Sequence, residues 1–252
     1  MELTWVGHAT TLLDVDGHRL LTDPVVTKRV AHLRRRRPVP PADTYDVDTV
    51  LLSHVHVDHL HLPSLRRLRP SAHVVAPHGS GRLLRRAGFA EVTEVVAGDR
   101  VRSGPVTLNV VAANHHSGRG PHSRVHAEPV GFVVEGGGHR VYFPGDTDLF
   151  PEMRDLVSDH GEFDAALLPI WGWGANLGPG HLDPERAATA VDLMRPRLVV
   201  PIHYGTYAPE DGRRRLPGWF GEPPTAFIHH LRDLGHDDRL RLLEPGGRLG
   251  VT

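Results

Sequence analysis

Residues 53–59 read Ser-His-Val-His-Val-Asp-His and place three histidines and one aspartate within six consecutive positions. They follow directly on the apolar run Thr49-Val50-Leu51-Leu52, which is typical of a buried β-strand. The end of a strand holds the backbone rigid while its last side chains project toward a common point. Imidazole and carboxylate groups suit Zn²⁺, Mn²⁺ or Fe and disfavour soft copper sites. The stretch therefore predicts a metal site at a strand end, with a solvated histidine-rich loop as the alternative.

Three further segments place a histidine or an aspartate just after a predicted strand. They are 114–119 (Asn-His-His-Ser-Gly-Arg), 144–148 (Pro-Gly-Asp-Thr-Asp) and 201–205 (Pro-Ile-His-Tyr-Gly). Any one of these residues alone would more often lie on the surface, but together they follow successive strands. We therefore expect these strand ends to supply the remaining ligands.

The composition narrows the class of protein. The chain has 252 residues, a formal net charge of −1, 20 histidines and no cysteine. Without cysteine there is no disulfide, no thiolate nucleophile, and no cysteine-ligated zinc or iron–sulfur cluster. The near-neutral charge argues against nucleic acid as a partner, because such binding depends on excess positive charge. No run approaches 18 apolar residues and the N-terminus alternates like a strand, so we expect no membrane span, no targeting segment and a cytoplasmic location. The sequence favours no particular oligomeric state.

Short strand-like runs fill the first half of the chain, and strands alternate with helices in the second half. The expected strands are 3–6, 11–15, 19–22, 49–52, 73–76, 92–96, 106–112, 130–135, 140–143, 165–170, 198–201 and 239–243, and the expected helices are 63–68, 80–87, 150–157, 184–194 and 224–234. Residues 34–44, which are rich in arginine and proline, are expected to form a solvated loop. The pattern predicts an α/β fold of two packed sheets with helices outside, built as a single domain over 1–252.

The order of these segments resembles the metallo-β-lactamase superfamily. The resemblance rests on Thr-Asp-Pro at 22–24, His-x-His-x-Asp-His at 54–59, the histidine at 115, Gly-Asp at 145–146 and the histidine at 203. Further blocks at 5–10, 114–120, 181–185 and 201–206 are similar to a branch with ascorbate-6-phosphate lactonases and N-acyl-phosphatidylethanolamine phospholipase D enzymes. The resemblance implies a four-layer αβ/βα sandwich of two mixed sheets with outer helices and a dinuclear centre at one edge.

Carried over residue by residue, the resemblance implies two sets of metal ligands. His54, His56 and His115 would hold one ion, Asp58, His59 and His203 would hold the other, and Asp146 would bridge them. His116 stays an alternative to His115, because the two stand side by side. We expect two divalent ions, with Zn²⁺ favoured and Mn²⁺ or Fe as alternatives.

Further residues are expected to act around these ligands. Two ions about 3.5–4 Å apart can share a water and make a bridging hydroxide available at neutral pH. We expect Asp58 to steer the proton of this nucleophile. His181, just before the 184–194 helix, is expected to stabilise the transition state or to protonate the leaving group. Asp23 and His8 are candidates for partners of the ligands. Arg119 is a candidate for binding an anionic group, and segment 171–180 is expected to line the pocket.

These features predict a metal-dependent hydrolase that cleaves a small-molecule ester, lactone or phosphodiester, as lactonases or phosphodiesterases do. Three alternatives stay open: a nuclease or phosphodiesterase of the same superfamily acting on nucleic acid, a redox di-iron protein, and a non-catalytic metal-binding or ligand-sensing protein. The near-neutral charge disfavours the first, and His56, where relatives of the di-iron type carry Glu, disfavours the second. The complete set of ligating residues disfavours the third.

Overall fold

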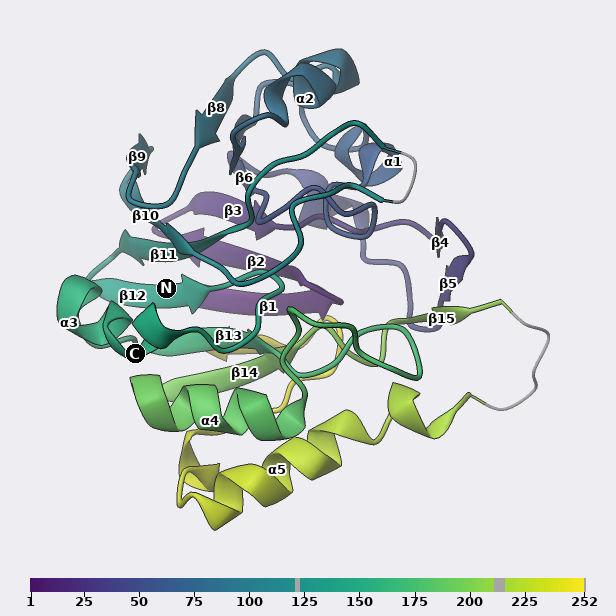
Figure 1. Ribbon diagram of the computed structural model, residues 1–252. Helices are drawn as coiled ribbons and strands as arrows, with labels where there is room; N and C mark the ends of the chain where they lie inside the picture. Colours follow the sequence, from purple (N-terminus) through teal and green to yellow (C-terminus); the bar gives the residue numbers. More distant parts are fainter. Residues whose placement is uncertain (121–122, 211–215, 252) are drawn as a thin grey trace.

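The computed structural model describes residues 1–120, 123–210 and 216–251, so parts of the C-terminal segment 206–252 (211–215 and Thr252) lie outside the described residues. Two large mixed sheets pack face to face (Figure 1). One has seven strands in the order β16 (Arg248–Gly250), β1 (Glu2–Gly7), β2 (Thr10–Val15), β3 (His18–Thr22), β6 (Thr49–Leu51), β7 (His73–Pro77) and β8 (Val92–Val95). The other has six, in the order β14 (Leu198–Ile202), β13 (Ala165–Pro169), β12 (His139–Phe143), β11 (Val130–Gly136), β10 (Val106–Ala112) and β9 (Arg100–Ser103). A small third sheet holds β15 (Tyr207–Pro209), β5 (Leu33–Arg35) and β4 (Arg29–Val30).

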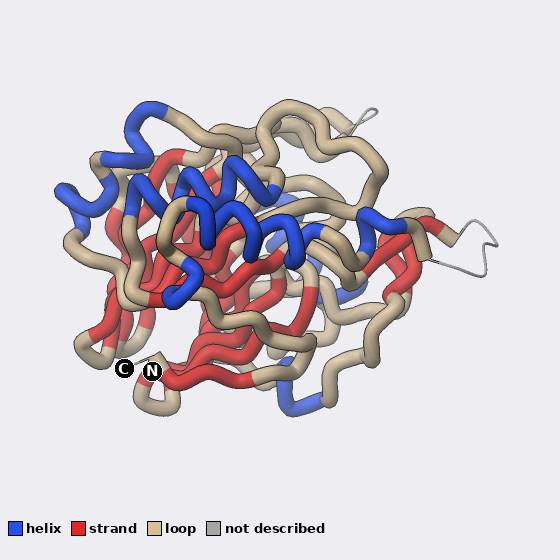
Figure 2. Tube along the Cα trace, turned by 90° about the horizontal axis from the view of Figure 1, so that it is seen from below, coloured by secondary structure: helices blue, strands red, loops and turns tan. Residues whose placement is uncertain are grey.

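Helices lie on the outside of the two large sheets, as Figures 1 and 2 show. They are α1 (Leu62–Leu65), α2 (Gly81–Ala87), α3 (Leu156–His160), α4 (Pro184–Met194) and α5 (Pro223–Asp233), with 3₁₀ turns η1 (Ala42–Tyr45), η2 (Pro151–Arg154), η3 (Gly218–Phe220) and η4 (Asp237–Arg239). The predicted four-layer sandwich is confirmed. Within the described ranges no helix has both the length and the apolar content needed to cross a bilayer.

Helix α4 forms for the reasons that its sequence indicates. The Asp183 side chain accepts a hydrogen bond from the backbone N–H of Arg186 at 2.8 Å, and Pro184 occupies the first turn, where no N–H is needed. Ala187, Ala190, Val191 and Met194 are buried and attach the helix to the core. This fixes the chain just before the helix, where His181 lies.

The apolar core is divided by the seven-stranded sheet. Between the large sheets lie side chains such as Trp5, Leu51 and Phe132, which are all essentially inaccessible to solvent. On the other side, a second cluster with Val74 and Leu84 packs under α1 and α2. Full burial of one such side chain contributes about 1.5–3 kcal/mol, so both faces hold the strands rigidly in place.

The directions of the strands bring the predicted site residues to one edge of the sandwich. In the seven-stranded sheet β1 and β3 are both antiparallel to β2, and β6 is parallel to β3. In the other sheet β10 and β12 are both antiparallel to β11, while β12, β13 and β14 are parallel. The carboxyl ends of β1, β3 and β6 therefore lie at a common edge, as do those of β10, β12 and β14.

The predicted strand at 239–243 is wrong. Residues Asp237–Arg239 form η4, Leu240 makes one isolated bridge to Val199, and Leu242 is 49% exposed. The chain then turns through Pro245-Gly246-Gly247 and only afterwards forms β16, which pairs with β1. Leu240 and Leu243 pack partly buried against the core, and the segment adds no strand to the sheet.

The solvated loop expected at 34–44 is also wrong in part, because Leu33–Arg35 form β5 and Arg35 is only 7% exposed. Its guanidinium donates to the carbonyls of Val6 at 2.6 Å, Val25 at 3.1 Å and Pro38 at 2.9 Å. It also contacts the hydroxyl of Tyr207 on β15 at 3.3 Å. A fixed fork of five N–H donors can satisfy several carbonyls at once, which explains why an arginine is buried here.

Replacing Arg35 by alanine is expected to lower the free energy of unfolding by about 3 kcal/mol, because several buried carbonyls lose their donor. Arg34→Ala is the matched control. Arg34 is exposed and pairs with Glu210 at the surface, so its loss should cost less than about 1 kcal/mol. Urea unfolding followed by circular dichroism measures both. Equal effects would contradict the structural role given to Arg35.

Candidate metal centre

Four of the predicted ligand histidines have the ring nitrogen Nδ1 fixed by an oxygen acceptor. His59 donates to Asp23 Oδ2 at 2.7 Å, His115 to the Gly180 carbonyl at 2.6 Å, His203 to the Trp171 carbonyl at 2.9 Å and His54 to Ser53 Oγ at 2.9 Å. Ser53 Oγ can accept because its own hydrogen goes to Asp23 Oδ2, 2.5 Å away. With the proton held at Nδ1, each ring presents the lone pair of Nε2 to the centre.

The first set of converging donor atoms comes from three histidines. The Nε2 atoms of His54 and His115 each lie 3.0 Å from Nδ1 of His56. His54 and His56 follow β6, and His115 follows β10, so the two large sheets both contribute to this set. The structure thus brings together the three histidines that the resemblance assigns to one ion.

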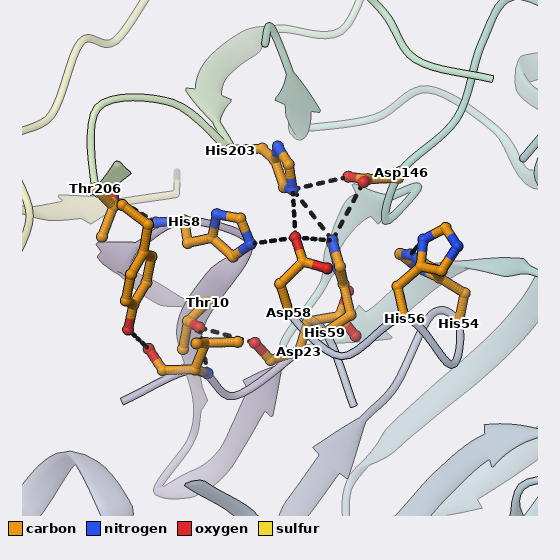
Figure 3. A network of polar contacts seen from close by, with 12 residues as sticks. His8, Thr10, Asp23, His54, His56, Asp58, His59, Asp146, His203 and Thr206 are labelled. Carbon is orange, nitrogen blue, oxygen red and sulfur yellow. Dashed lines mark hydrogen bonds and ion pairs between the residues drawn. The ribbon is translucent and has the colours of Figure 1, made fainter. Parts of the chain in front are cut away.

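The second set is built around His59 and His203, whose Nε2 atoms are 3.1 Å apart (Figure 3). Asp146 places Oδ2 at 3.2 Å from His59 Nε2 and Oδ1 at 3.3 Å from His203 Nε2. Asp58 Oδ2 lies 3.9 Å and 4.0 Å from the same two nitrogens. Strand ends from both sheets therefore meet a second time.

The residues present fit divalent metal ions. Ligands about 2.0–2.1 Å from a tetrahedral Zn²⁺ lie about 3.3–3.4 Å from one another. The donor atoms given above are separated by 3.0 to 4.0 Å, which brackets that value. Moreover, Oδ1 of Asp146 is buried and makes no regular hydrogen bond within the described part of the chain. A buried carboxylate oxygen of this kind requires a cation or a donor.

The electrostatics of the site favour neutral rings at His115 and His203 and positive charge at His59. Burial lowers the pKa of His115 to about 4 and that of His203 to about 3, so both rings are neutral at pH 7. Burial opposes ionisation of Asp146, but His203 and His59 outweigh it and hold the pKa of this carboxyl well below its usual value. Around His59 the effect of burial is exceeded by Asp146 and Asp23, which raise the pKa of its imidazole well above the usual value. The field at His59 therefore favours positive charge, as a divalent ion would supply.

Asp23 joins the ligands to the sheet. Its carboxylate is fully buried and accepts hydrogen bonds from the Ser53 N–H at 2.8 Å, from Ser53 Oγ and from His59. The Ser53 side chain also lies against Gly145, where an added Cβ would collide with it. The φ of Gly145 is +66°, a conformation that favours glycine. Sequence reasoning missed Ser53 as a partner of the site, although it stands directly before the first predicted ligand. It also missed the carbonyls of Trp171 and Gly180, which no side-chain pattern reports.

The remaining candidates are placed differently. His8 is buried with Nε2 3.3 Å from Asp58 Oδ2, and His181 has Nε2 3.6 Å from Asp146 Oδ2. His116 is exposed and its ring centre lies 6.4 Å from that of His115, so the structure brings His115 and not His116 into the cluster. Arg119 donates from Nη1 to the carbonyls of Val55 and Leu60 and faces a cavity.

That cavity opens beside both donor sets and has a volume of about 340 Å³. Its lining includes His56, Asp58, Asp146, His181 and His203, so the candidate metal centre forms part of its floor. The expected contribution of segment 171–180 is confirmed, since Gly172, Trp173, Gly174, Asn176, Leu177 and Gly178 all line it. The ring of Trp173 makes an edge-to-face contact with that of His32, with centroids 5.1 Å apart.

Comparison with known proteins places the chain in a family. The profile described as the Beta-lactamase superfamily domain matches residues 18–204. The chain belongs to this superfamily. A UPF0173 metal-dependent hydrolase of Methanopyrus kandleri is 31% identical over 248 residues, which cover 98% of each chain. The N-acyl-phosphatidylethanolamine-hydrolyzing phospholipase D 1 of Caenorhabditis elegans is 32% identical over 226 residues, 81% of this chain and 64% of that protein.

Other relatives extend the comparison. An uncharacterized protein of Mycobacterium tuberculosis is 34% identical over 242 residues, which cover 90% of this chain but only 63% of the relative's own length. The solved structure of a metallo hydrolase from Ignicoccus hospitalis has a TM-score of 0.74 at 25% identity and covers 98% of this chain and 97% of that one. An isothiocyanate hydrolase from Delia radicum gut bacteria has a TM-score of 0.78 at 18% identity over 99% of each chain, which shows a shared fold.

Changing Asp23 to asparagine is expected to weaken binding of one divalent ion by about 10–100-fold, because the side-chain amide must point its NH₂ group at a donor, either the N–H of Ser53 or Nδ1–H of His59. Zinc affinity is measured by competition with a chelator. Asp43→Asn, at an exposed position, is the control. An unchanged affinity in Asp23→Asn would show that this carboxylate does not support the ligands.

Proposed function

We propose that the protein is a dinuclear metal-dependent hydrolase that acts on a small ester, lactone or phosphodiester. The observation that carries this proposal is that two sets of nitrogen and oxygen donors lie side by side and open into one cavity. Membership of the superfamily and the likeness to proteins named as metal-dependent hydrolases support it.

In this proposal His54, His56 and His115 hold one ion, and Asp58, His59 and His203 hold the other. Asp146 stands between the two sets. Its Oδ2 atom lies near His59 of the second set and also near His181, and the ring of His181 packs on His115 of the first set. Zn²⁺ is the favoured ion, with Mn²⁺ or Fe as alternatives that the same donors accept. Divalent ions at such a site supply an activated water near neutral pH and polarise the substrate oxygen.

His181 is the proposed proton donor to the leaving group. Its Nδ1 donates to the Gly178 carbonyl at 3.1 Å, so Nε2 is the nitrogen directed to the cavity side, near Asp146. The ring packs edge-on against His115, with centroids 4.6 Å apart, which restricts its orientation. It also lies just before α4, whose N-terminus favours negative charge in its neighbourhood. For this step the ring would carry a proton on both nitrogens, with Nδ1–H on the Gly178 carbonyl, and the proton on Nε2 would pass to the leaving-group oxygen on which charge develops.

The lining of the cavity favours a small substrate with an anionic group and an apolar part. Arg119 is half-buried and pairs with two carbonyls; among the described residues no carboxylate lies within ion-pair distance of it. A desolvated guanidinium without an acidic partner favours a substrate anion. Trp173, Leu177 and Val57, which is 41% exposed, provide the apolar part of the lining.

The metal-loaded protein is expected to hydrolyse bis(p-nitrophenyl) phosphate or a member of a lactone panel, and removal of metal by a chelator should abolish turnover. His203→Ala should lose one ion and lower kcat by about 100-fold or more, because an assembled centre supplies several kcal/mol of transition-state stabilisation. His229→Ala, at a position with a 70% exposed side chain, is the control. A fully loaded protein that is inactive on all these substrates contradicts the proposal.

His181→Ala is expected to lower kcat by about 10²–10⁴-fold, the range typical of a lost general acid. The bound metal should stay at the wild-type ratio, since the Nε2 atom of His181 lies 3.6 Å from Asp146 and no hydrogen bond joins the two side chains. Steady-state kinetics and elemental analysis of the same preparation give both numbers. Full turnover with full metal content would remove His181 from the chemistry.

A further inference from the structure

His8 is a buried histidine with a tightly fixed backbone beside the second ligand set. It follows β1, is 2% exposed and has a φ of +56°, which is uncommon for a residue with a side chain. Its N–H donates to Thr206 Oγ1 at 2.8 Å, and its carbonyl accepts from Trp5 Nε1 at 2.9 Å and from the His203 N–H at 3.0 Å. Surrounding groups therefore impose this conformation, and one of them belongs to a proposed ligand.

The fixed backbone directs the His8 ring at Asp58. The ring packs on that of His203 with centroids 4.1 Å apart and meets the edge of Tyr207 at 5.6 Å. Its Nε2 atom is 3.3 Å from Oδ2 of Asp58 (Figure 3). This nitrogen is buried and makes no regular hydrogen bond within the described residues. A buried ring nitrogen without a partner is unusual and calls for an acceptor or donor nearby.

The carboxylate of Asp58 is the acceptor that faces this nitrogen. None of the regular hydrogen bonds of the described residues ends on its carboxylate. The residue is 9% exposed, and its side chain lies between His8, His59 and His203. By contrast, the four histidines that are proposed to bind metal through Nε2 each have a fixed partner on Nδ1. These partners are Ser53 for His54, Asp23 for His59, Gly180 for His115 and Trp171 for His203. A buried ring nitrogen without a regular hydrogen bond thus faces a carboxylate that has no fixed partner of its own.

We propose that His8 is the positioning residue of Asp58, to whose carboxylate its Nε2–H donates, so that Asp58 is held toward His59 and His203. This inference rests on the proposed function, which makes Asp58 a metal ligand. Carboxylate ligands are themselves commonly hydrogen-bonded, and loss of such a partner weakens the site. His8 is not needed as a ligand, because His59, His203, Asp146 and Asp58 already offer donors, and a further protein ligand would take the position that a catalytic ion keeps open for water.

Two substitutions separate the hydrogen bond from the packing of the ring. His8→Phe keeps an aromatic ring against His203 and removes the donor, whereas His8→Gln removes the ring and keeps an N–H donor at a similar reach. Zinc affinity is measured on the zinc-loaded protein by competition with a chelator. His8→Phe is expected to lose about 10–100-fold in affinity for one of the two ions, and His8→Gln to stay within about threefold of the wild type. His78→Phe, at an exposed position, is the control.

Other outcomes overturn the proposal. Wild-type affinity in His8→Phe combined with a loss in His8→Gln would make the contact one of packing alone. A loss in His8→Gln as deep as that in Asp58→Ala would make His8 itself a ligand. If the wild type binds two ions and hydrolyses no test substrate, the proposed function fails, while the affinities of the variants still decide the role of His8.

A measurement on the wild type gives a readout besides metal affinity. In the ¹⁵N-histidine spectrum of the zinc-loaded protein, the signal that is lost in His8→Gln is expected to carry its ring proton on Nε2. A His8 ring with the proton on Nδ1 and Nε2 bound to metal, or with Nε2 free of a proton, overturns the proposal.

Discussion

The buried carboxylate of Asp23 links the scaffold to the candidate centre. It accepts hydrogen bonds from the backbone N–H of Ser53, from the hydroxyl of Ser53 and from the ring of His59. The backbone N–H of Asp23 donates to the carbonyl of Leu51 on β6. The end of β3 is thereby joined to the end of β6 at the point where the ligand segment begins. An uncompensated carboxylate is expensive to bury, so these donors must be in place whenever the fold is formed. The geometry of the ligands is consequently a property of the folded sheets.

The site also holds backbone conformations that residues with side chains seldom adopt. His8, Asp23 and His203 all have positive φ, and each directly follows a strand that ends at the site. Such conformations persist where the surroundings over-determine them, and they tend to occur at functional sites. In each case the chain turns directly after the strand, and this turn directs the side chain toward the site.

Sequence reasoning succeeded where local chemistry and strand order agree. The apolar run before Ser53 and the ligand motif after it are adjacent in the chain, so both the strand and the site could be predicted together. It failed at Arg35, because four neighbouring arginines indicate a solvated loop and only the distant carbonyls of Val6 and Val25 reveal a buried one. It failed at 239–243, where the leucines indicate a strand but the segment contacts β14 only through one isolated bridge and one hydrogen bond at Val199. The carbonyl partners of His115 and His203 leave no trace in side-chain identity.

Segment 171–180 both lines the cavity and anchors two of the histidines. This double role limits how the segment can change among members of the superfamily. Its side chains at 173 and 177 shape the cavity, while its first and last backbone carbonyls hold His203 and His115, one ring from each donor set. Replacing the whole segment to change the cavity wall would also replace the two carbonyls that hold the rings of His203 and His115. New selectivity would therefore evolve most readily through single side-chain exchanges between the two ends, with the endpoints of the loop conserved as a frame.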